Sequence, residues 1–211
     1  MRTFMQWAAL GIASLALYSA TLRADVLFND LGPGDTFDNN AGRVVTGENY
    51  VSFGNVDQAM PFKVGPGGAL FTSADIGVYH VSGDASTDVY LMDSNGNAPG
   101  SNVLASMSIN NIGTFPAVLR SVSPGASVPL NANTTYWIVL DAHNDADLAW
   151  CFSTDGTVGY AGRSGNPPGA WNWEPNDQAM ALRINGTNLP EPALLGALGI
   201  LPVALRRRRI Q

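Results

Sequence analysis

The sequence predicts an all-β protein. We expect a single antiparallel β-sandwich or jelly-roll-like domain, flanked by an N-terminal signal helix and a short hydrophobic C-terminal helix. Two observations lead to this fold class. Turn-forming stretches such as GPGG, DSNGNAPGS and SGNPPG recur through the middle of the chain, and the runs between them are short and show no long helical period. Many short strands separated by such turns are typical of sandwiches and jelly rolls.

Nine segments between the turns are predicted strands. The strongest is TTYWIVL, because it is aromatic or β-branched almost throughout. In chain order the predicted strands are 44–53, 58–64, 74–81, 87–92, 103–109, 118–122, 134–141, 148–153 and 178–185.

Two of these strands resemble each other. DQAMPFKV at 57–64 is echoed by DQAMALRI at 177–184. Strand alternation places Met60, Phe62 and Val64 on one face of the first copy, and Met180, Leu182 and Ile184 on one face of the second. We therefore expect two similar strands, as neighbours in one sheet. Pro61 cannot donate to a ladder, which favours an edge or a bulge.

The N-terminus has the pattern of a secretory signal peptide over residues 1–24. Arg2 is followed by a short apolar run and, at Ala24, by the better of two candidate cleavage sites, the other being Ala20. The alternative is a retained anchor helix, although the run is short for a span, which needs about 20 residues.

The C-terminus, residues 188–211, has three parts in order. Pro190, Glu191 and Pro192 precede thirteen mostly apolar residues, and Arg206, Arg207, Arg208 and Arg209 follow. An apolar helix of this length covers roughly 20 Å, less than a hydrocarbon core of about 30 Å. The arginines would stay on the cytoplasmic side.

This tripartite ending resembles the PEP-CTERM sorting signal of Gram-negative bacteria. The resemblance implies recognition by the membrane enzyme exosortase, with cleavage near Pro-Glu-Pro. Pro202, inside the apolar run, departs from most such helices. An ordinary tail anchor is the alternative, and the final tail is trimmed, attached or retained.

The remaining domain, residues 25–187, is strongly acidic. It contains five Lys and Arg against sixteen Asp and Glu, a formal net charge of −11. Nucleic-acid binding needs a basic face and is therefore not expected.

The same domain resembles the choice-of-anchor R type of exported β-sandwich. The resemblance lies in FNDLGPGDTFDNNAG, QAMPFKV, VYLMDSNGNAPGSNVLAS and LNANTTYWIVLDA. It implies attachment to surfaces through varying tails and carries no established activity.

Catalytic motifs are not found in the sequence, which lacks nucleophile-elbow, zincin, Walker A and dinucleotide patterns. Cys151, the single cysteine, lies in the apolar run LAWCFS and is predicted to be a buried, inert thiol. His80 lies in a strand, and His143 lies beside several carboxylates in DAHNDAD. We expect no enzyme, with a secreted hydrolase as the weakest alternative.

Calcium is the one cofactor that the sequence suggests. DAHNDAD offers oxygen ligands from Asp141, Asn144, Asp145 and Asp147. DSNGN offers Asp93, Asn95 and Asn97 but then departs from the EF-hand pattern at Ala98 and Leu104. The competing interpretation is that these residues form turns and caps.

A carbohydrate site is suggested by NPPGAWNWEPND. Trp171 and Trp173 share one side of an extended segment, beside Glu174, Asn176 and Asp177. Tryptophans can stack on sugar rings, while carboxylates and amides bond hydroxyls; in the competing interpretation the aromatics close the core.

These observations predict an exported, non-catalytic cell-surface or extracellular-matrix protein of a Gram-negative bacterium. Its expected partners are signal peptidase, exosortase and, transiently, the inner membrane. The main alternative is a carbohydrate-binding module that contacts extracellular polysaccharide.

Overall fold

The computed structural model describes residues 25–52 and 54–189, and this part of the chain is all-β, without a helix. Both predicted terminal helices and the sorting motif, from Pro190 to the arginines, lie outside the described residues. The strands are β1 (Asp25–Asn29), β2 (Phe37–Thr46), β3 (Val56–Lys63), β4 (Ala69–Ser82), β5 (Thr87–Ser94), β6 (Pro99–Ile109), β7 (Val118–Val122), β8 (Val128–Leu130), β9 (Thr135–Ala142), β10 (Asp147–Ser153), β11 (Val158–Ser164), β12 (Asn172–Gln178) and β13 (Leu182–Asn188).

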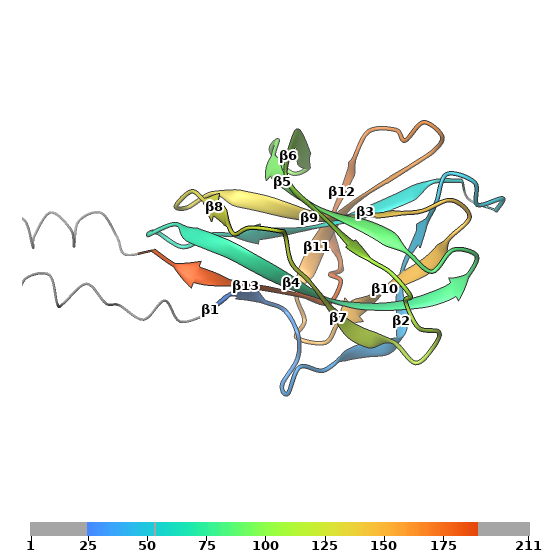
Figure 1. Cartoon of the computed structure of the whole chain (residues 1–211), viewed down its shortest axis with the longest axis horizontal. Helices are drawn as coiled ribbons and strands as arrows, with labels where there is room; N and C mark the ends of the chain where they lie inside the picture. Colours follow the sequence, from blue (N-terminus) through green and yellow to red (C-terminus); the bar gives the residue numbers. More distant parts are fainter. Residues whose placement is uncertain (1–24, 53, 190–211) are drawn as a thin grey trace, which may run out of the picture.

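The strands form one antiparallel sheet that curls into a sandwich-like body (Figure 1). The main path runs β1-β13-β4-β10-β2-β3-β9-β5-β6, and only the pair Thr46 and Val56 joins β2 to β3. The long strand β4 pairs with β13 and β10 and also with β7 and β8. The weak β2–β3 junction therefore separates a half built around β4 from a half built around β9.

The main core lies inside this curl, and the two echoed segments contribute to it as predicted. Met60, Phe62 and Val64 are buried on one side, and Met180, Leu182 and Ile184 are fully buried on the other. The backbone N–H of Met180 donates to the Met60 sulfur at 3.4 Å.

The prediction that the echoed segments are neighbouring strands is wrong. The second copy is split between β12, a bridge at Met180 and β13, and β13 is separated from β3 by β4, β10 and β2. The two segments have similar hydrophobic patterns but line opposite walls of one core. A hydrophobic pattern determines which face of a strand is buried, but it does not determine which strand pairs with it. Pro61 lies beyond the last β11 pair, where β3 pairs with β9 alone, in agreement with an edge position.

The predicted boundaries agree with β5, β7, β9 and β10, whereas β4 starts at Ala69 and β6 at Pro99, ahead of the predicted starts at 74 and 103. The predicted strand 44–53 is wrong, because β2 ends at Thr46 and a turn-rich segment follows. Four strands were not predicted: β1, β8, β11 and β12. Two of these, β1 and β12, are polar or half-exposed edge strands, which lack the apolar alternation that reveals a buried strand.

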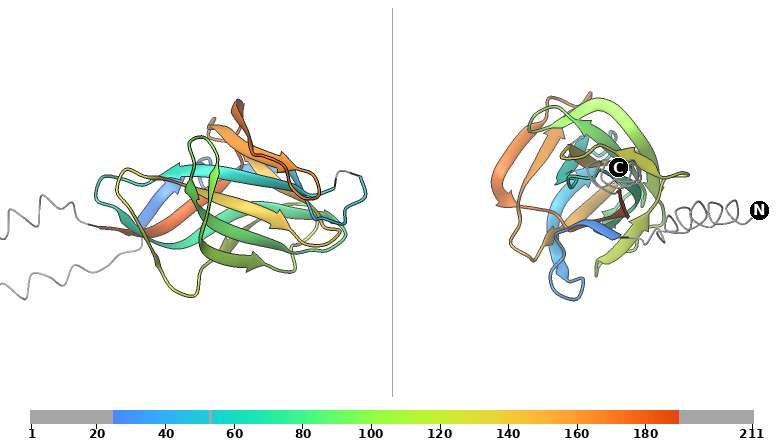
Figure 2. Two further views of the ribbon diagram at one scale, coloured as in Figure 1. Left: turned by 90° about the horizontal axis from the view of Figure 1, so that it is seen from above. Right: turned by 90° about the vertical axis from the view of Figure 1, so that its left-hand side faces the viewer.

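The two ends of the domain lie side by side. β1 pairs antiparallel with β13, so that Asp25 faces Gly186, and the Asn188 side chain donates to the Asp25 carboxylate at 3.3 Å. The start of β1 and the end of β13 are therefore at the same end of the molecule (Figure 2). No helix among residues 25–52 and 54–189 is long and apolar enough to cross a membrane.

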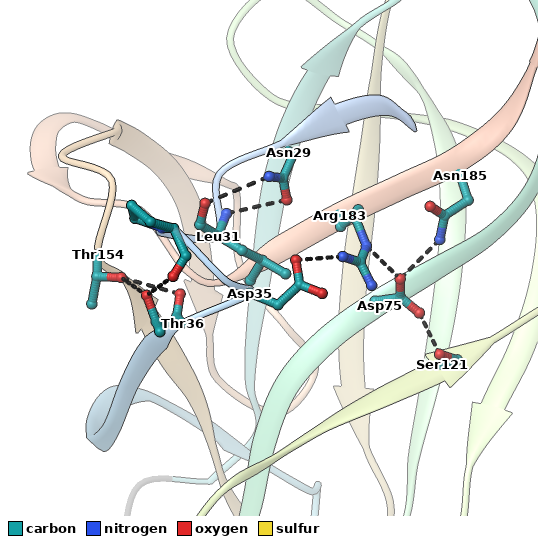
Figure 3. Close-up of polar contacts among 10 residues, drawn as sticks. Asn29, Leu31, Asp35, Thr36, Asp75, Ser121, Thr154, Arg183 and Asn185 are labelled. Atoms are coloured by element: carbon teal, nitrogen blue, oxygen red, sulfur yellow. Dashed lines mark hydrogen bonds and ion pairs between the residues drawn. The ribbon is translucent and has the colours of Figure 1, made fainter. Parts of the chain in front are cut away.

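A polar network fixes the loop after β1 to the half of the sheet that is built around β4 (Figure 3). Arg183 on β13 bridges Asp35 in the loop, at 2.6 Å, and Asp75 on β4, at 2.8 Å. Asp75 also accepts hydrogen bonds from Ser121 and Asn185. Burial would raise the pKa of Asp75, but these donors outweigh it and hold that pKa below its usual value.

Candidate functional site

The predicted carbohydrate segment is strand β12, which folds back along β11. Trp171 and Trp173 lie on the same side, as the alternation predicted, and both pack over a second apolar cluster formed by Ala59, Trp137, Val139 and Ala161. The Trp173 ring meets Trp137 edge-on at 5.8 Å, and the Arg163 guanidinium covers Trp171 at 4.5 Å. Much of both indole surfaces therefore attaches β12 to the sheet.

Gly159 is required for this packing. Its φ of +102° is strained for other residues, and a Cβ there would come within 2.8 Å of the Trp173 ring. The backbone of β11 thus makes room for the indole.

The other side of β12 faces a hollow of about 280 Å³, which we call the β11–β12 hollow. Glu174 and Asn172 line it, and the Asn172 amide donates to the Glu174 carboxylate. The buried side chains of Gln58 and Tyr160 also line it. The structure thus separates Glu174 from the tryptophans and joins it to Gln58.

The last two predicted carbohydrate ligands, Asn176 and Asp177, are exposed. The Asp177 carboxylate forms an ion pair with Arg43 at 2.6 Å. Arg43 in turn stacks on the Tyr160 ring, 4.5 Å from its centre. These contacts hold the Tyr160 ring, which lines the hollow.

A row of carboxylates crosses the outer face beside the second apolar cluster. Asp57 on β3 is fully buried and accepts from the Arg163 Nε at 2.6 Å. The charge of Asp141 on β9 acts on this carboxylate, and Asp141 in turn faces Asp88 on β5. Desolvation by burial, followed by the charge of Asp141, raises the pKa of Asp57 to about 6 despite Arg163.

Asp57 and its half-buried neighbour Asp141 each hold a proton more tightly than an ordinary carboxylate. Asp57 Oδ1 has no N–H or hydroxyl donor. Burial also raises the pKa of the neighbouring Asp141. Asp88 differs, because hydrogen bonds from Ser108, His143 and Tyr90 outweigh its burial and lower its pKa.

The predicted calcium ligands are engaged by other groups of the domain. Asp141 belongs to the row above, and Asp147 accepts from the Tyr50 hydroxyl at 3.0 Å. Asp145 accepts from the Asp84 N–H at 3.0 Å, while Asn144 donates to the Asp84 carboxylate at 2.9 Å.

The second loop follows the same pattern: the Asp93 carboxylate accepts from the Asn102 N–H at 3.1 Å, and Asn95 and Asn97 are exposed. Within the described ranges 25–52 and 54–189, no group of three or more His, Cys, Asp and Glu could hold a metal ion.

His143 lies between a serine and a carboxylate. Its Nδ1 is 3.0 Å from Ser86 Oγ, and its Nε2 is 3.2 Å from Asp88 Oδ1. Ser86, however, is 8% exposed and donates its hydroxyl hydrogen to Asp84 at 2.6 Å. As arranged, the network joins the loop after β4 to the loop after β9.

The other two reactive side chains singled out in the sequence have structural surroundings. His80 Nε2 is 2.9 Å from the Gly83 carbonyl oxygen. Cys151 is buried as predicted, and burial raises the pKa of its thiol to about 12.

No protein-family model matches the chain, and no curated protein matches it either.

Sequence reasoning missed the floor of the hollow. Gln58 is in phase with Met60 and Phe62, so it is an amide at a core-facing position of β3. A polar side chain in the buried phase of a strand was the available signal. Tyr160 and Asn172 belong to β11 and β12, whose pairing was not predicted.

Proposed function

We propose that the protein is an exported, non-catalytic surface or extracellular-matrix protein, delivered by its PEP-CTERM-like tail through exosortase. The observation that carries the proposal is the shared end of the domain, where Asp25 and Asn188 are hydrogen-bonded. A leader before Asp25 and a tail after Asn188 then reach the same membrane without crossing the domain. The net charge of −11 over residues 25–187 suits solubility outside the cell.

The non-catalytic part is supported by the surroundings of His143. Ser86 is buried and its proton is directed to Asp84, so His143 is not placed to activate it. The hydrolase alternative is tested by broad hydrolase screening of wild type against His143→Ala. A signal that depends on His143 would contradict the proposal.

The export proposal is tested by expressing the full chain in a Gram-negative host with and without exosortase, and identifying both termini by mass spectrometry. We expect a start at Asp25 and, only with exosortase, an end near Pro192. Replacing Arg206, Arg207, Arg208 and Arg209 by alanine should leave the tail unprocessed, whereas the exposed control Lys63→Ala should not. Recovery of the intact chain from the cytosol would contradict the proposal.

A second candidate function is binding of extracellular polysaccharide. The β11–β12 hollow supports it, because Glu174 and Asn172 there lie beside a buried amide and an aromatic ring. This candidate is compatible with export and is tested separately.

A further inference from the structure

We infer that the β11–β12 hollow binds one unit of a neutral, polyhydroxylated ligand, such as one sugar ring of a polysaccharide. This inference rests on the carbohydrate-binding candidate and gives it a site away from the tryptophan side of β12. It does not depend on how the tail is processed.

The Gln58 amide lies at the floor of the hollow. The residue is 6% exposed, and its Nε2 donates to the Val44 carbonyl at 3.0 Å, which fixes the orientation of the amide. The other end, Oε1, is buried without a hydrogen-bond partner. Because an unpaired buried acceptor is costly, a hydroxyl that enters the hollow and donates to Oε1 is favoured.

Side chains of both charges lie around the hollow. Glu174, the cross-strand neighbour of Tyr160, contributes one carboxylate, and the Arg43 guanidinium, which is paired with Asp177, lies 4.5 Å from the centre of the Tyr160 ring. Asn172 and Gln58 are neutral. A ligand with a net charge would meet both signs, whereas hydroxyl groups donate to the carboxylate and amide oxygens and accept from the N–H groups.

The size and lining of the hollow suit a single sugar ring. The volume of about 280 Å³ lies just below the ~300–1,000 Å³ of pockets for drug-sized ligands, so it suits a single ring. Val56 and the Tyr160 ring supply apolar surface for the C–H face of such a ring. Ala170 and Asn172 at the rim are exposed, so that a longer chain can continue into solvent.

Gly162 keeps the hollow open. A Cβ at this position would lie 3.0 Å from Gln58 Oε1 and 3.6 Å from the Tyr160 ring. Gly162→Ala therefore fills the space in front of the unpaired oxygen, without requiring a left-handed backbone conformation.

The test is saturation-transfer NMR with the protein purified from cells that express the full chain. The probes are glucose, galactose, mannose and N-acetylglucosamine at millimolar concentration, with glucuronate and glucosamine as charged probes. The variants are Gly162→Ala and Glu174→Gln, and Glu48→Gln is the matched control, since Glu48 lies on an exposed turn. Thermal melts establish that each variant is folded.

We expect at least one neutral sugar to bind to wild type and to Glu48→Gln. Loss of one charge-assisted hydrogen bond in Glu174→Gln should weaken binding about tenfold, and Gly162→Ala should weaken it at least as much. Glu174→Gln keeps the size of the side chain and removes only its charge. If this variant binds like wild type, the hollow is not the site, although sugar binding elsewhere would stand. Preference for a charged probe would also overturn the inference. No binding by any sugar would overturn both the site and the carbohydrate-binding candidate, and would leave export untouched.

Discussion

Two buried aspartates in this domain each accept a hydrogen bond from an arginine Nε, yet their pKa values are shifted in opposite directions. On β13, the Arg183 Nε donates to Asp75 at 2.8 Å; on β11, the Arg163 Nε donates to Asp57 at 2.6 Å. The pKa of Asp75 is lowered, whereas that of Asp57 is raised to about 6.

The remaining ligands of each carboxylate explain the difference. Asp75 also receives donors from Ser121 and Asn185, while Asp57 has no further donor and faces Asp141. An arginine alone therefore does not decide whether a buried carboxylate is charged. The decision depends on whether every oxygen has a donor.

The largest expected effect is a difference in the loss of stability when each of the two arginines is replaced. Arg183→Leu should lower the free energy of unfolding by about 3 kcal/mol at pH 7, because it leaves a charged carboxylate buried. Arg163→Leu should cost only about 1 kcal/mol, since Asp57 can hold a proton instead. Urea unfolding of both variants provides the comparison, and equal losses would show that the two pairs are equivalent.

A third buried carboxylate, Asp30, extends the comparison to a site without arginine. Burial raises its pKa from 3.8 to about 8, although it accepts the Leu182 N–H at 2.6 Å. The folded state therefore binds the proton more tightly than the unfolded chain, and stability falls as pH rises between those two values.

Asp30→Asn mimics the protonated form and should remove this loss. At pH 9 the variant should be more stable than wild type by about 1–2 kcal/mol, and at pH 4 the two should be similar. Urea unfolding at both pH values measures this. A variant that is less stable at pH 9 would mean that the Asp30 charge is stabilising.

A smaller effect should come from the partner of Asp57. Asp141→Asn removes a negative charge, so the pKa of Asp57 should fall from about 6 towards its ordinary value. Stability should then decline less as pH rises from 4 to 6, by under about 1 kcal/mol. Carbon NMR of the aspartate carboxyl groups would follow this titration. Asp145→Asn, at an exposed position, is the matched control and should leave the Asp57 titration unchanged.

The smallest effect concerns calcium. Because Asp145, Asp147 and Asp93 already accept hydrogen bonds within the domain, we expect equal melting temperatures with added calcium and with chelator. A rise of several degrees in calcium would instead support the metal sites suggested by DAHNDAD and DSNGN.

Sequence alone was sufficient where burial creates a pattern. TTYWIVL became β9 and the predicted strand 148–153 became β10, because continuous apolar residues mark buried strands. The phases of Met60 and Met180 were also correct. Local pattern does not encode long-range pairing, so the separation of β3 from β13 required the structure.

The candidate site shows the same limit. Alternation placed Trp171 and Trp173 on one side, but only the fold reveals that Trp137 lies beneath them. Likewise, Gln58 and Glu174 are 116 positions apart, and the hollow that joins them depends on β11 and β12. Sites assembled by edge strands carry little local signal.

The hydrogen-bonded neighbours Asp25 and Asn188 have an engineering consequence. Because the first and last residues of the domain are adjacent, residues 25–189 can be inserted between two neighbouring positions of another polypeptide. The domain can therefore be spliced into a surface loop of an unrelated carrier, or circularly permuted by joining these ends, with little distortion of either host or guest.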